Sequence, residues 1–107
     1  MFSVPRHPRS FDTEIAHLRR FVARADWDAR PTFCYRLRAA LREALASVEQ
    51  SAETEHCARA VIRAAEHFAN ALRPNFTPST IELTARIDEL EMAGVRALDA
   101  QARVRAA

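Results

Sequence analysis

The sequence predicts an all-α fold, a four-helix up-down bundle preceded by a short extended N-terminal arm. Apolar residues recur at steps of three and four along most of the chain, which is the period of an amphipathic helix. Prolines and capping residues divide this pattern into four segments with short connections, and short connections favour antiparallel neighbours. The chain has 107 residues, of which 49% are apolar, enough for one domain with its own core.

The N-terminal region contains the arm and the first helix. Two prolines within a basic stretch predict an extended arm over residues 1–9, and residues 10–107 then form the bundle domain. Ser10 is expected to cap the first helix, which is predicted for residues 11–26. Arginines occupy the outer face of this helix. Its core-facing residues are Phe11, Ile15, Leu18, Val22 and Ala25, with Phe21 on the flank.

The second and third helices are separated by a change in the phase of the apolar pattern. The second helix is predicted for residues 31–50, and Pro31 suits its start because the first N–H groups of a helix are unpaired. Its apolar stripe is Phe33, Leu37, Ala40, Leu41, Ala44, Leu45 and Val48. The next apolar set begins at Cys57, roughly half a turn around the helix axis. This change predicts a break, with Ser51 as the N-cap of a third helix over residues 52–73.

The fourth helix follows a proline-containing loop. Ser79 and Glu82 match the capping-box spacing, so the helix is predicted to start at residue 79 and to fray after Val104. Its main apolar stripe is Leu83, Ile87, Leu90, Gly94 and Leu98, flanked by Ala97. A second apolar set lies on nearly the opposite side and consists of Ile81, Ala85, Met92 and Val95.

This second set has two interpretations. A surface helix of a monomeric bundle needs only one apolar stripe, so the four residues indicate a sandwiched helix or a partner-binding surface. Alternatively, Ile81 packs under the proline-containing loop, while Met92 and Val95 are isolated surface residues of the kind that most proteins carry. The sequence leaves both interpretations open.

Charge is distributed unevenly along the chain, whose net charge is +2. Residues 1–42 contain nine arginines and four acids, a balance of +5, and residues 43–107 contain seven arginines and ten acids, a balance of −3. Either the two halves pack with complementary faces, or the basic N-terminal half meets an anionic partner. All 16 basic residues are arginines, which is typical of a GC-rich genome.

Two of the four histidines lie on one face of the predicted third helix, at a spacing too long for a shared metal ion. His56 and His67 are eleven residues apart on one helix, about 16 Å along its axis, so they do not share a metal ion. We expect no metal and no cofactor. Arg59 and Arg63 lie on the same face, so the set His56, Arg59, Arg63 and His67 is a candidate anion-binding patch. The alternative is the ordinary solvated face of an amphipathic helix.

Other sequence features narrow the class of protein. A chain with one glycine contains no Gly-rich phosphate loop, and no pair of carboxylates is predicted to be buried for acid–base catalysis. Cys34 and Cys57 are predicted to be reduced and structural. No apolar run is long enough for a membrane span, and the first residues lack the apolar stretch of a signal peptide. These features predict a cytoplasmic protein that does not associate with a membrane.

We therefore expect a non-enzymatic helical bundle that acts through protein–protein interaction, either with itself as a homodimer or with a second macromolecule. The second set of apolar residues on the fourth helix is the expected contact. The alternative function is an anion- or nucleic-acid-associated binding module that uses the basic face of the third helix and the N-terminal arm. Nucleic-acid binding is the less favoured of the two.

Overall fold

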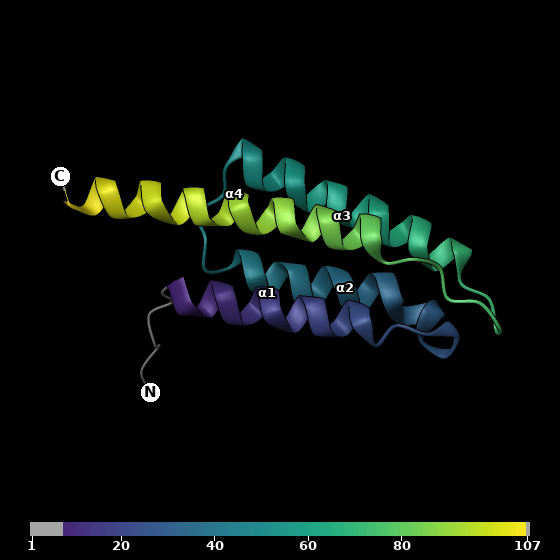
Figure 1. Ribbon diagram of the computed structural model, residues 1–107. Coiled ribbons are helices and arrows are strands. Elements are labelled where there is room, and N and C mark those ends of the chain that lie inside the picture. Colours follow the sequence, from purple (N-terminus) through teal and green to yellow (C-terminus); the bar gives the residue numbers. More distant parts are fainter. Residues whose placement is uncertain (1–7, 107) are drawn as a thin grey trace, which may run out of the picture.

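The computed structural model describes residues 8–106, which contain four α-helices, one 3-10 helix and no β-strand. The elements are α1 (Pro8–Ala23), η1 (Trp27–Ala29), α2 (Arg30–Leu45), α3 (Ala52–Ala71) and α4 (Ile81–Ala106). The predicted all-α fold is confirmed. The chain reverses direction at each connection between helices (Figure 1), and contacts join α1 to α2, α2 to α3, α3 to α4, and α4 back to α1.

The start of α1 differs from the prediction. The helix begins at Pro8, so Ser10 lies inside it and the predicted N-cap role of Ser10 is wrong. Proline suits a first helical position, because its missing N–H would be unpaired there in any case. The rest of the predicted arm, residues 1–7, lies outside the described residues. α1 ends at Ala23, and the following turn is fixed by Asp26, whose carboxylate accepts a hydrogen bond from Ala29 N at 3.0 Å.

The predicted break between the second and third helices is confirmed. Ser51 has extended backbone geometry, and its hydroxyl accepts a hydrogen bond from Thr54 N at 3.1 Å. Thr54 Oγ1 accepts in return from Ser51 N at 3.0 Å, so a capping box starts α3. α2 ends at Leu45, earlier than the predicted residue 50, yet Val48 in the connection still packs in the core at 6% exposure.

The start of α4 also differs in detail. The helix begins at Ile81, whose N–H donates to the hydroxyl of Ser79 at 3.2 Å. Within the described residues no hydrogen bond joins Ser79 and Glu82, so the predicted capping box is not formed there. Before this loop, α3 ends at Ala71, and Leu72 leaves the helix while remaining fully buried.

The core lies where the four predicted stripes meet. Phe33 of α2 stacks on Phe21 of α1 at 5.3 Å between ring centroids and lies 5.4 Å from Phe68 of α3. Phe11 of α1 packs against the backbone of α4 at Gly94, where a Cβ atom would overlap the Phe11 ring. A glycine is therefore needed for α1 and α4 to approach this closely.

α4 is longer than the helices it packs against, with 26 residues compared with 16 in α1 and 20 in α3. Its C-terminal turns extend past the ends of its neighbours (Figure 1), and Val104 is 77% exposed there. Among the described residues, no helix is long and apolar enough to cross a bilayer.

Candidate functional site

The outer side of α4 carries the predicted partner-binding residues. Steps of four, seven and three place Ile81, Ala85, Met92 and Val95 on one face, which we call the outer stripe. The exposed fractions are 78% for Ile81, 55% for Met92 and 39% for Val95, while Ala85 is half-buried. The interpretation in which the preceding loop covers Ile81 is therefore wrong. Residues 8–106 do not sandwich α4 on this side.

An ion-pair cluster borders the outer stripe on the α1 side. Arg19 donates to Asp88 at 2.6 Å and to Glu91 at 2.8 Å, joining α1 to α4. Partial burial acts to lower the pKa of Arg19, but the hydrogen bonds to the two carboxylates outweigh it, so the pKa of the guanidinium is raised. The stripe is thus bordered by charges that are already paired inside the chain.

A shallow cleft borders the stripe on the α3 side. It has a volume of about 510 Å³ and is lined by Glu53, His56, Cys57, Asp88, Glu89, Met92 and Arg96. Arg96 donates to Glu53 at 2.9 Å across this cleft. Burial raises the pKa of the Cys57 thiol, with the nearby carboxylates of Glu53 and Glu89 acting in the same direction. The thiolate is therefore disfavoured, and Cys57 is a poor candidate for a nucleophile.

The four residues of the predicted anion-binding patch lie in a row along the solvent-facing side of α3. His56, Arg59, Arg63 and His67 are all exposed. Within residues 8–106, none of them forms a hydrogen bond or an ion pair. His56 also borders the α3–α4 cleft, whose lining does not include Arg59, Arg63 or His67. The patch is a linear set of charges along one helix.

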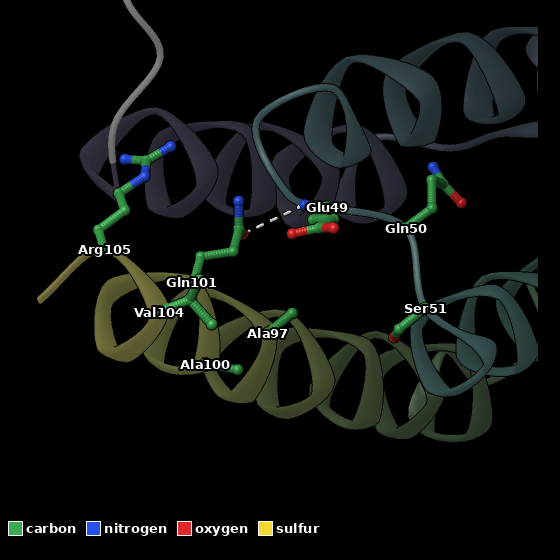
Figure 2. Close-up of a pocket in the computed structure, with 8 residues that line it drawn as sticks. All are labelled: Glu49, Gln50, Ser51, Ala97, Ala100, Gln101, Val104 and Arg105. Atoms are coloured by element: carbon green, nitrogen blue, oxygen red, sulfur yellow. Dashed lines mark hydrogen bonds between the residues drawn. The ribbon is translucent and has the colours of Figure 1, made fainter. Parts of the chain in front are cut away.

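A groove that the sequence did not predict lies beneath the projecting end of α4. It has a volume of about 410 Å³ and is lined by Glu49, Gln50, Ser51, Ala97, Ala100, Gln101, Val104 and Arg105. Figure 2 shows Gln101 reaching the connection before α3, where its side-chain oxygen accepts a hydrogen bond from Glu49 N at 3.2 Å. One sign of this groove is present in the sequence, because the main apolar stripe of α4 and its flanking Ala97 are followed by a further apolar residue, Val104, one heptad later.

A second unpredicted cleft lies between α1 and α2 and collects basic side chains, including Arg20, Arg24 and Arg36. The sequence indicated this cleft only through the net positive charge of residues 1–42. Composition alone did not indicate which arginines the fold would bring together.

Within residues 8–106, no three His, Cys, Asp or Glu side chains are grouped as a metal site would require. A comparison of the chain with protein-family models, with curated proteins and with solved structures finds no match.

Proposed function

We propose that this chain is a non-enzymatic helical bundle that acts by protein–protein contact, and that the outer stripe of α4 binds a second copy of the chain. The observation that carries the proposal is the exposure of Ile81, Met92 and Val95 on one face of a helix whose opposite face fills the core. Water around exposed apolar side chains is released when a partner covers them, which favours association.

The charge distribution along α4 supports an antiparallel arrangement of two copies. Residues 81–91 contain four acids and one arginine, a balance of −3, whereas residues 95–106 contain three arginines and one acid, a balance of +2. In an antiparallel pair centred near Met92, the acidic half of each α4 faces the basic half of the other. Asp88, Glu91 and Arg96 already pair inside the chain, so Glu82 on one helix and Arg103 and Arg105 on the other carry this complementarity. Two-fold symmetry produces this pairing twice, and the opposed helix dipoles act in the same direction.

The size of the apolar contact indicates a dimer of modest affinity. Burying side chains such as Met92 and Val95 contributes about 1.5–3 kcal/mol each. Each chain supplies both residues, but association costs about 4–15 kcal/mol of translational and rotational freedom. At the favourable ends of both ranges the net free energy corresponds to a dissociation constant of about micromolar, which is the tightest that this contact supports, so self-association should depend strongly on concentration.

A charged substitution in the outer stripe tests the proposal. Met92→Glu should convert the dimer to monomer in light-scattering measurements, because a two-fold axis places the new carboxylate in the contact twice. The matched control is Tyr35→Glu, which introduces the same charge at a 78% exposed position on α2 and should leave the dimer intact. Circular dichroism should show unchanged helical content in both variants. Equal loss of the dimer in both variants would contradict the proposal.

A second function, an anion- or nucleic-acid-associated module, is favoured by one observation. Arg59 and Arg63 face solvent with no acidic partner among the described residues. A gel-shift assay with duplex DNA at low salt tests it, because phosphate contacts give a steep dependence on salt. The double variant Arg59→Gln/Arg63→Gln should lose retention, while the charge-matched control Arg103→Gln/Arg105→Gln should keep it. Absence of retention by the unmodified chain would exclude this function.

We also propose a cytoplasmic location. The two free cysteines, Cys34 and Cys57, are both half-buried on different helices, an arrangement that suits a reducing compartment. A fusion to a fluorescent protein, followed by cell fractionation of the native host, would test the location. Recovery of the fusion in a membrane or extracellular fraction would contradict it.

A further inference from the structure

The cleft between α1 and α2 has an unusual lining, and we call it the basic cleft. It has a volume of about 260 Å³ and is lined by His17, Arg20, Phe21, Arg24, Ala25, Ala29, Phe33 and Arg36. Three guanidinium groups and one imidazole therefore surround an apolar floor, and no carboxylate belongs to the lining.

The helix packing explains how these residues meet. Steps of three and four place His17, Arg20 and Arg24 along one side of α1, beside Phe21. The Phe21 ring stacks on Phe33 at an interplanar angle of 10°, which fixes the floor of the cleft. Arg36, one turn after Phe33, places its guanidinium 5.7 Å from the centre of the Phe21 ring. This cation–π contact holds Arg36 at the wall of the cleft.

The arginines of the basic cleft differ from other arginines of the bundle in their pairing. Arg19 contacts two carboxylates, and Arg38 lies 3.6 Å from Glu66. Among the described residues, Arg20, Arg24 and Arg36 form no ion pair. Three like charges around one cleft repel each other. A bound anion would attract all three and so offset the repulsion between them.

Nearby acids do not neutralise the basic cleft. Asp26 and Asp28 follow α1, and Glu14 lies one turn before His17, but none of the three belongs to the lining. The Asp26 carboxylate is engaged with Ala29 N at the start of η1. The local excess of positive charge is therefore a property of the fold and not only of the sequence balance.

We infer that the basic cleft binds a small phosphate-bearing anion. Guanidinium groups match the oxygens of phosphate with paired N–H donors, and three of them favour a ligand with more than one negative charge. A volume of about 260 Å³ suits a phosphate, a diphosphate or a small phosphate ester, and it is too small for a folded partner. The site lies on α1 and α2, so this inference does not depend on self-association through α4.

Isothermal titration calorimetry at low ionic strength tests this inference. Inorganic phosphate, pyrophosphate and glycerol 3-phosphate are titrated separately into the unmodified chain, and at least one should bind with one site per chain. Tighter binding of the ester would identify a small metabolite that uses the apolar floor, whereas tighter binding of an inorganic ion would identify free phosphate or diphosphate. Both results support the inference.

Substitutions locate the binding site. Arg24→Gln and Arg36→Gln should each weaken binding by about tenfold or more, since each removes a charge-assisted hydrogen bond. The control Arg42→Gln removes the same charge from an exposed position of α2 outside the cleft and should change the affinity less than about twofold. Arg20→Gln provides a further test if loss of the Arg36 contact loosens Phe21, and melting curves verify the fold of every variant.

Three results would overturn the inference. The first is no saturable binding of any of the three anions at millimolar concentration. The second is equal weakening in the cleft variants and in the Arg42→Gln control, which would indicate diffuse attraction by net charge. The third is retention of a long polyanion such as duplex DNA without binding of any small phosphate, which would indicate an extended surface.

Discussion

The two sides of α4 carry apolar residues with similar spacing, but their environments are opposite. On the inner side, Leu83, Ile87 and Leu90 are at most 2% exposed, and Gly94 accommodates the ring of Phe11. On the outer side, Ile81 and Met92 are more than half exposed. Helical periodicity places both sets on definite faces, but it does not determine what covers each face. The difference shows that the inner set stabilises the bundle, whereas the described residues leave most of the outer stripe uncovered, as the proposed self-association requires.

The same comparison applies to charge. Next to the outer stripe of α4, Arg19 pairs with Asp88 and Glu91, and Arg96 pairs with Glu53. Around the basic cleft, between α1 and α2, the arginines find none among the described residues. The outer stripe therefore contains apolar side chains that remain exposed to water. The basic cleft contains arginines that have no ion pair among the described residues.

The largest expected effect separates two residues that are neighbours on α4. Leu90→Ala should lower the free energy of unfolding by about 2–5 kcal/mol, because Leu90 is fully buried and its removal leaves a cavity. Met92→Ala should change it by less than about 0.5 kcal/mol at concentrations where the chain is monomeric. Urea unfolding followed by circular dichroism measures both. Similar losses in the two variants would mean that the outer stripe belongs to the core.

A smaller effect is expected at the contact between α1 and α4. Gly94→Ala adds a Cβ atom that overlaps the Phe11 ring, and such overpacking costs about 1–3 kcal/mol. The better helix propensity of alanine offsets up to about 1 kcal/mol, so a net loss is expected. Phe11→Leu in the Gly94→Ala background should cost less than Phe11→Leu alone, as a double-mutant cycle would show. Additive losses would mean that the two residues are not in contact.

The ion-pair cluster of Arg19 should contribute less. Arg19→Gln removes hydrogen bonds of 2.6 and 2.8 Å to Asp88 and Glu91, but the side chain is 32% exposed and solvent screens the pair. A loss of at most about 1 kcal/mol is expected, and it should shrink as salt is added. Thermal unfolding at low and high salt is the measurement. A loss independent of salt would indicate that Arg19 acts through packing of its aliphatic stem.

The smallest effect concerns the two thiols. Burial raises the pKa of Cys34 and of Cys57, and nearby carboxylates act in the same direction. Both thiols should therefore react with a disulfide reagent more slowly than free cysteine at mildly alkaline pH, and unfolding should abolish the difference. Because the folded state holds these protons more tightly, stability should decrease as pH rises through the range where thiols titrate. Rates equal to that of free cysteine would contradict this account.

Much of the fold could be predicted because its signals are local. The change of phase after Val48 and the capping potential of Ser51 predicted the break before α3, and the apolar stripes predicted the core. The end of α2 was misplaced because Val48 continues the stripe after the helix has ended. A buried residue in a connection has the same spacing as one in a helix, so hydrophobic periodicity does not distinguish the two.

The sites depend on tertiary pairing and were less accessible from the sequence. The outer stripe was predicted because all its members lie on one helix, but its exposure required knowledge of what α1, α3 and the loops cover. The basic cleft was missed because Arg24 and Arg36 come from different helices and meet only when Phe21 stacks on Phe33. The sequence also did not predict that position 94 requires a glycine, because this requirement depends on the Phe11 ring lying against it.

Sedimentation equilibrium of the unmodified chain tests the central claim most directly, because it measures mass without a variant or a label. The experiment covers low micromolar to near-millimolar concentrations at physiological salt. The exposed outer stripe of α4 predicts that the weight-average mass rises from that of one chain towards that of two and then levels off. A mass that remains that of a single chain at the highest concentration would contradict self-association through α4.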